Sequence, residues 1–209
     1  MLLKQNYINL IRYHVLKLIF RLLLVFLISG LSCNFPGTAE AQSHYVSEYQ
    51  IKAGLIYKFF EYVEWPEEAY PVSGQFVTIG IIGTNPFGQS FREVEGLPVN
   101  GRKLVVKYFN SDATFEELQE CQVLFITPSL GGARTLEIIS ALKASPVLTI
   151  SDSVRFVQKG GMINFVSRDG KVNFEINKSA AERTGIKIRS KLLRVSIRVI
   201  TDNNTSPNN

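Results

Sequence analysis

Between residues 49 and 63, apolar side chains recur at the spacing of one face of an α-helix. We predict an amphipathic helix here, which ends before Trp65 because Pro66 disfavours helical geometry in the residue before it. The intervening polar residues, such as Lys52 and Lys58, are expected to face water. The apolar stripe consists of Ile51, Leu55, Ile56, Phe59, Phe60 and Val63.

Downstream, short apolar runs alternate with helical patterns. Strands that alternate with helices in this way indicate an open, mostly parallel α/β sheet flanked by helices. One predicted helix opens with a capping box from Thr114 to Glu117. The apolar runs predict strands at residues 75–83, 103–109, 122–128 and 146–152. The helices are predicted at residues 86–97, 114–120 and 133–144.

The pattern changes after residue 152. Residues 161–177 predict two strands around a hairpin turn at Arg168-Asp169-Gly170. A second capping box, from Ser179 to Glu182, predicts another helical turn. A short extended piece and a closing helix are expected in residues 186–200.

The predicted fold class is α/β. We expect a single domain at residues 42–200, with an open, mostly parallel sheet flanked by helices, a C-terminal β-hairpin and a closing helix. Residues 201–209 are polar and are expected to form a disordered tail.

The first 41 residues have the pattern of a secretory signal peptide. A basic stretch without an acid precedes an apolar run at residues 22–32, and Ala39-Glu40-Ala41 fits a cleavage site. The alternative is an uncleaved membrane anchor, although an apolar run of about ten residues is short of the roughly twenty that span a bilayer. Lipidation at Cys33 is a weaker prediction, because the preceding residues match the lipidation pattern poorly. We therefore expect export to the periplasm.

Cleavage after Ala41 changes the charge of the chain. It removes four of the 23 basic and one of the 18 acidic residues, which leaves a net charge of +2. A nucleic-acid partner therefore has no electrostatic support. Cys121 would be the single remaining cysteine, which excludes an intrachain disulfide. Its place at the start of an apolar run predicts a buried, unreactive thiol.

Few residues in the sequence could carry out catalysis. The two histidines, His14 and His44, lie in or just after the leader, so the domain has no histidine for a hydrolase triad or a zinc site. The glycines of residues 80–88 do not have the spacing of a dinucleotide fingerprint, and no phosphate-binding loop occurs. We expect neither enzymatic activity nor a metal or other cofactor.

A small-molecule site is expected where the parallel strands end. Ligands of open α/β sheets bind outside the carboxyl ends of the strands. Backbone N–H groups before a helix, with an arginine nearby, could hold a small anion. The alternative is that these residues form only connecting turns, which use the same residue types. The candidate ligand-binding residues are Asn85, Ser129, Gly131, Gly132, Arg134, Ser151 and Asp152.

Several segments, in order, resemble the YfiR family of exported regulatory proteins. They include YQIKAGLIYKFFEYVEWP from Tyr49, CQVLFITPS from Cys121, and GGMINFVSRDGKVNFEIN from Gly160. The resemblance implies a periplasmic α/β domain that forms a homodimer. It also implies a repressor that binds the periplasmic region of an inner-membrane diguanylate cyclase and so lowers cyclic di-GMP. Related domains occur beside sensor kinases and membrane receptors, so the membrane signalling partner stays open. Disulfides found in family members have no counterpart here.

Aromatic residues near and beyond the end of the first predicted helix have two interpretations. Tyr62, Trp65 and Tyr70 fall off the apolar stripe or beyond it and combine a ring with a polar tip, as partner-interface residues often do. Alternatively, Trp65 and Pro66 fix the path from the helix into the first strand, and we favour this second interpretation.

Three functional hypotheses follow. The leading one is an exported, non-enzymatic regulator that acts through protein contact. The alternatives are a periplasmic small-molecule binding module, which could tune a sensor kinase or receptor, and a structural component of the envelope.

Overall fold

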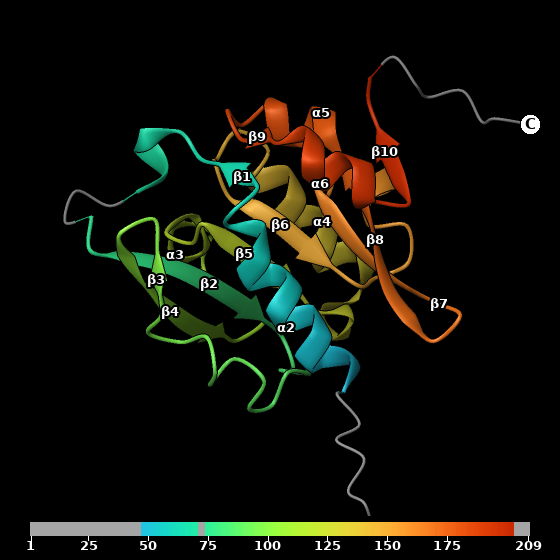
Figure 1. Ribbon diagram of the computed structural model, residues 1–209. Helices are drawn as coiled ribbons and strands as arrows, with labels where there is room; N and C mark the ends of the chain where they lie inside the picture. The colour runs from blue at the N-terminus through green and yellow to red at the C-terminus, as the bar shows by residue number, and fades with distance from the viewer. Residues whose placement is uncertain (1–46, 71–73, 203–209) are drawn as a thin grey trace, which may run out of the picture. The chain divides into compact units, whose positions relative to one another are not determined.

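The computed structural model describes residues 47–70 and 74–202 (Figure 1). The predicted signal peptide, Cys33 and residues 203–209 of the predicted tail lie outside the described residues. Within the described residues, no helix has the length and apolar character needed to cross a bilayer.

Eight strands of the described residues form one sheet, in the order β10-β8-β7-β6-β5-β2-β4-β3. Neighbouring strands from β4 to β7 run parallel, β8 returns antiparallel to β7, and β10 lies parallel to β8. The open, mostly parallel sheet expected from the sequence is therefore confirmed. The bounds are β2 (Phe76–Ile82), β3 (Pro98–Val99), β4 (Arg102–Phe109), β5 (Val123–Ile126), β6 (Leu148–Ser151), β7 (Ile163–Arg168), β8 (Lys171–Asn177) and β10 (Arg198–Ile200).

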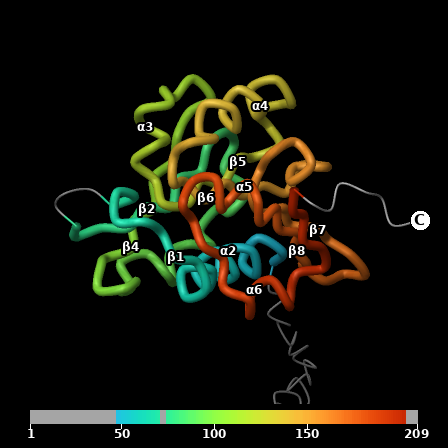
Figure 2. The backbone as a smooth tube through the Cα atoms, turned by 90° about the horizontal axis from the view of Figure 1, so that it is seen from above, coloured from blue at the N-terminus to red at the C-terminus, as the bar shows by residue number. Residues whose placement is uncertain are grey.

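Helices lie on both faces of the sheet (Figure 2). Helix α2 (Glu48–Phe59) packs on one face, where Ile56 shares a core with Ile79 of β2. Helix α4 (Gly131–Ala141) and the short α3 (Phe115–Gln119) lie on the other face, where Ile138 shares a second core with Ile82. Side chains on the two sides of the buried strand β2 thus pack into two different hydrophobic cores. Helix α5 (Lys178–Glu182) and the expected closing helix, α6 (Ser190–Val195), follow the hairpin.

Helix α2 ends at Phe59, four residues before the predicted end. Val63 instead belongs to β1 (Val63–Glu64), which pairs antiparallel with β9 (Lys187–Ile188). Val63 is buried in the same core as Phe59, so the apolar pattern continues although the helix does not. The one-turn 3-10 helix η1 (Glu67–Ala69) follows Pro66.

The helix predicted at residues 86–97 is wrong. This segment is a series of turns, with bonds such as that from Ser90 N to Phe87 O at 2.9 Å. Gly88 and Gly96 have φ angles of 54° and 81°, which end any helical path. The apolar spacing comes instead from Phe87 and Phe91, whose rings are buried.

Two local signals in the C-terminal part have different outcomes. The predicted hairpin turn is confirmed, because Asp169 and Gly170 both have positive φ and Arg168 pairs with Lys171. The predicted capping role of Ser179 is wrong: Asn177 caps α5, and its Oδ1 accepts from Ala180 N at 2.9 Å.

Two further 3-10 turns complete the connections, η2 (Pro128–Leu130) before α4 and η3 (Val157–Lys159) before β7. The predicted capping box of Thr114 and Glu117 is present at the start of α3. Cys121 is buried as predicted, and burial raises the pKa of its thiol to about 12.

Candidate functional site

The turns after β2 and β5 are bonded to each other. Thr84 N donates to Ser129 Oγ at 2.9 Å, and the hydroxyls of Ser129 and Thr127 are 2.7 Å apart. A Cβ on Gly83 would lie 2.2 Å from Thr127 Oγ1, so only glycine permits this close approach. Asn85 closes its own turn by accepting from Phe87 N at 2.9 Å. These polar groups serve the connections, and a ligand role for Asn85 and Ser129 stays a prediction.

Arg134 lies on the first turns of α4 but binds a different loop. Its Nη2 donates to the carbonyl oxygen of Ala113 at 2.7 Å and its Nε to that of Ser111 at 3.1 Å. The guanidinium also lies over the Phe115 ring, at 5.1 Å. Since these contacts hold Arg134 to the loop before α3, they do not favour the predicted anion site at Gly131, Gly132 and Arg134.

A largely buried ion pair between Lys52 and Asp152 lies at the end of β6, and the more exposed Glu48 joins it. Lys52 Nζ lies 2.7 Å from Asp152 Oδ2 and 2.6 Å from Glu48 Oε1. The Tyr49 hydroxyl donates to the same Asp152 oxygen at 2.8 Å. The prediction that Lys52 faces water is wrong: only 2% of the residue is exposed, because the first turns of α2 lie over the end of β6.

These contacts perturb ionisation on α2. Hydrogen bonds from Lys52 and Ser167 lower the pKa of Glu48. Burial, and then the hydrogen bond to Asp152, raise the pKa of Tyr49. The sequence contained one signal for this network: Lys52 precedes the buried Ile56 by four residues and so lies on the core-facing side of α2.

Trp65 is a core residue. It is 9% exposed, its ring stacks on Phe60 with centroids 5.1 Å apart, and its Nε1 donates to the carbonyl oxygen of Gln122 at 3.0 Å. The interpretation that Trp65 fixes the path into the sheet therefore agrees with the geometry. Its burial leaves little surface for a partner, whereas Tyr62 and Tyr70 are only half-buried.

Cationic side chains surround these two tyrosines. The Arg102 guanidinium lies 3.9 Å from the Tyr70 ring centroid, and Lys191 Nζ lies 5.3 Å from that of Tyr62. Arg189, on the same side, pairs with Glu64 at 2.8 Å and is 58% exposed along its side chain. A cavity of about 440 Å³ includes Tyr70, Arg102 and Arg189 in its lining. We call Tyr62, Tyr70, Arg102, Arg189 and Lys191 the tyrosine–arginine face.

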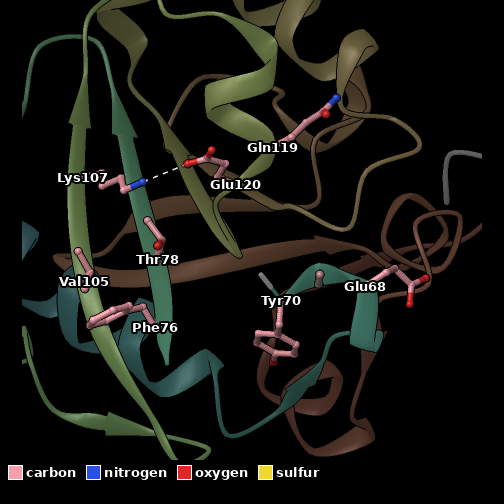
Figure 3. A pocket seen from close by; sticks show the side chains of 9 residues that line it. Glu68, Tyr70, Phe76, Thr78, Val105, Lys107, Gln119 and Glu120 are labelled. Carbon is pink, nitrogen blue, oxygen red and sulfur yellow. Dashed lines mark hydrogen bonds and ion pairs between the residues drawn. The ribbon is translucent and has the colours of Figure 1, made fainter. Parts of the chain in front are cut away.

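A larger groove, of about 610 Å³, adjoins this face (Figure 3). Tyr70 and Glu68 line one side of it, and Phe76 and Val105 of the sheet line the other. Phe76 is 44% exposed, so this side of the groove presents an apolar surface. Tyr70 lines both hollows. Tyrosine and arginine beside an apolar depression are the composition typical of protein interfaces.

A family model described as DUF4154, YfiR/HmsC-like, matches residues 49–197. The chain belongs to the YfiR/HmsC-like family. The match includes nearly all the described residues and confirms the resemblance noted in the sequence. Membership supports, in general terms, a regulatory role in cyclic di-GMP signalling and the non-catalytic, periplasmic character of this family.

Other comparisons bear on the fold. No curated protein matches the sequence. The crystal structure of a conserved domain protein from Vibrio cholerae O1 biovar El Tor is similar, with a TM-score of 0.51 and 16% sequence identity. The likeness covers 74% of this chain and 60% of that protein, so this chain spans less than two thirds of the solved one. At this identity, the similarity shows the fold alone.

Proposed function

We propose that the protein is exported to the periplasm and regulates an inner-membrane signalling enzyme by direct contact, repressing a diguanylate cyclase. The observation that carries this proposal is the family match over residues 49–197. The leader pattern of residues 1–41 supports export, and the small net charge of the remaining chain suits a protein partner.

The tyrosine–arginine face is the contact surface that we propose. Tyr62 and Tyr70 are partly buried against the core that contains Trp65, and the Arg102 guanidinium lies over the Tyr70 ring. Preorganised aromatic and arginine side chains lose little conformational entropy when a partner binds. The adjoining groove could then accept an apolar side chain of the partner. A homodimer is a further part of the proposal, and light scattering of the purified protein would test it.

Capture from detergent-solubilised membranes tests the proposed partner. The purified protein is immobilised, and bound membrane proteins are identified by mass spectrometry. We expect a diguanylate cyclase with a periplasmic region to be recovered. Recovery of a sensor kinase or receptor would replace the cyclase as the partner, and recovery of no membrane signalling protein would contradict the proposal.

Arg189→Ala serves as the matched interface variant in this experiment. Arg183→Ala is its control, because Arg183 is also an exposed arginine with one carboxylate partner, Asp202 at 3.3 Å, but lies outside the face. Loss of capture with Arg189→Ala alone supports the face. Equal capture with both variants would exclude Arg189 from the contact.

A further inference from the structure

The last part of the described chain is strongly basic. Residues 178–198, from the start of α5 to the start of β10, contain seven basic residues and one acidic residue, a net charge of +6. The described residues before them, 47–70 and 74–177, contain 12 basic and 15 acidic residues, a net charge of −3. The small net charge of the domain therefore combines two regions of opposite sign. Such an asymmetry indicates a negatively charged partner for the basic region.

Some cations of this region are paired and others are not. Lys178 forms an ion pair with Glu182 at 2.7 Å, which neutralises its charge locally. Among the described residues, no carboxylate forms an ion pair with Lys191 or Arg194 of α6. Both of these side chains are exposed. Their charges are therefore available to a partner.

Helix α6 places these two cations beside an apolar side chain. Lys191, Arg194 and Val195 are separated by three and four residues, the spacing of neighbours on one helix face. Leu192 is only 4% exposed and packs into the core, whereas Val195 is 64% exposed. The helix thus anchors itself through Leu192 and presents a mixed basic and apolar side to solvent.

The chain beyond α6 extends this side. Ser196 has extended backbone angles, φ −74° and ψ 146°, so Val195 and Ile197 on either side of it point in similar directions. Ile197 is 46% exposed. Arg198 follows at the start of β10, the edge strand (Figure 1), and its ion pair with Glu175 is long, at 3.8 Å. We define the basic–aliphatic surface as Lys191, Arg194, Val195, Ile197 and Arg198.

The composition of the basic–aliphatic surface fits a lipid surface better than a protein. Exposed aliphatic side chains among basic ones bind membranes, because the apolar groups enter the acyl boundary and the cations attract anionic headgroups. Protein hot spots are instead enriched in tryptophan and tyrosine, and valine is under-represented there. A second copy that offered the same surface would bring Arg194 and Arg198 against like charges.

We propose that the basic–aliphatic surface binds the anionic phospholipid headgroups of a membrane. Arg194 and Arg198 lie at the level of the phosphates, and Val195 and Ile197 enter the boundary between headgroups and acyl chains. Lys191 also belongs to the tyrosine–arginine face, so lipid binding would hold that face beside a membrane protein. The choice of the inner membrane rests on the proposed function, whereas binding to lipid vesicles is measured without any membrane protein and can succeed or fail separately.

Co-sedimentation with lipid vesicles tests the proposal. The purified protein is mixed with vesicles of phosphatidylcholine alone, or of equimolar phosphatidylcholine and phosphatidylglycerol. We expect at least about tenfold tighter binding to the anionic vesicles, weakening as salt is added, because several cations each contribute electrostatic attraction. No binding, or equal binding to both kinds of vesicle, would overturn the proposal.

Charge reversal locates the binding surface. We expect Arg194→Glu to bind the anionic vesicles at least about tenfold more weakly than the wild type. Arg168→Glu is the matched control, because Arg168 lies at the β7–β8 hairpin, outside the surface, and is 74% exposed along its side chain. All variants share the N-terminus of the wild type, so binding by a retained leader would be equal in all of them. An equal loss in both variants would reduce the effect to net charge and contradict the surface.

Val195→Ser tests the apolar part of the surface. We expect about fivefold weaker binding to the anionic vesicles, because the variant loses apolar area that leaves water on binding. Val154→Ser is the control, since Val154 is 81% exposed outside the surface and should bind like the wild type. Circular dichroism and thermal unfolding show that each variant is folded. Equal binding by the two serine variants would contradict apolar insertion.

Light scattering examines the main alternative occupant, a second copy of the chain. If Arg194→Glu abolished self-association and left vesicle binding unchanged, the surface would be a contact between copies and the lipid proposal would be wrong. We expect the opposite result, in which Arg194→Glu has the oligomeric state of the wild type and loses vesicle binding.

Discussion

The two ends of the segment from Ser47 to Tyr70 use charged and aromatic side chains for opposite purposes. At the first end, Lys52 is buried and forms ion pairs with Asp152 and Glu48. At the second end, Arg102 and Lys191 lie over half-buried tyrosine rings, and Arg189 is largely exposed to solvent. A buried partner thus commits the charge of Lys52 to the fold, whereas the exposed cations at the second end are the ones that we propose for partner binding.

The largest effect is expected at the buried end. Lys52→Met leaves Asp152 buried without its cation, and we expect a loss of about 3–5 kcal/mol in the free energy of unfolding. Urea denaturation measures this change. Lys58→Met is the control on the same helix, because Lys58 has only an exposed pair with Glu61 and should behave like the wild type.

A double variant sharpens this test. Replacing both charges, in Lys52→Met/Asp152→Leu, should recover most of the lost stability, because an apolar pair avoids the cost of a buried unpaired charge. If Lys52→Met is as stable as Lys58→Met, the ionic network does not hold α2 to the sheet.

The junction between the two ends comes next. Trp65→Phe keeps a ring in the core but removes the indole N–H that bonds the buried Gln122 carbonyl. We expect a loss of about 1–3 kcal/mol in the free energy of unfolding, measured by urea denaturation. A loss no larger than that of Tyr62→Phe, which alters a half-buried ring, would show that the indole bond is unimportant.

The exposed end should affect binding rather than stability. Arg189→Ala removes a half-exposed cation of the tyrosine–arginine face. We expect roughly tenfold weaker binding to the membrane partner, because arginines at an interface often contribute more than 1 kcal/mol. Unfolding measurements should show little change, since exposed ion pairs contribute little. If the variant were destabilised but bound the partner with normal affinity, Arg189 would have a structural role and the proposed binding role would be contradicted.

The smallest effect concerns pH. The pKa of Glu48 is lowered in the folded state, so its ionised form favours folding above its ordinary value of 4.5. This contribution is lost as the pH falls below that value. Glu48→Gln should therefore be less stable than the wild type at pH 6, with the difference shrinking toward pH 3. The difference in stability is expected to be small because Glu48 is partly exposed to solvent. A difference that stays constant with pH would contradict the role of Glu48.

Local signals in the sequence predict local structure well in this protein. The Asp169-Gly170 turn and the Thr114 cap were predictable because the interactions that fix them lie within four residues. The false helix at residues 86–97 arose because Phe87 packs against Phe125, nearly forty residues away, with ring centroids 4.8 Å apart. A long-range contact can impose apolar spacing on a series of turns.

The candidate sites follow the same principle. The parallel strand pattern predicts that polar groups gather at the strand ends, and Asp152, which follows β6, lines a cavity, although its ligand role stays a prediction. The pairing with Lys52 was not predictable, because it joins residues 100 positions apart. Arg134 was assigned to the wrong neighbours for a similar reason, since the carbonyl oxygens that it binds belong to an earlier loop.

The proposed regulatory role is tested most directly by cyclic di-GMP levels in cells. The gene is deleted and then complemented with the wild type, with Tyr70→Ala/Arg189→Ala, or with Arg183→Ala. We expect deletion to raise the cyclic di-GMP level, and the wild type and Arg183→Ala to lower it again. The double variant should be present at the same protein level as the wild type but should leave the cyclic di-GMP level high. An unchanged level after deletion, or full restoration by the double variant, would contradict the account.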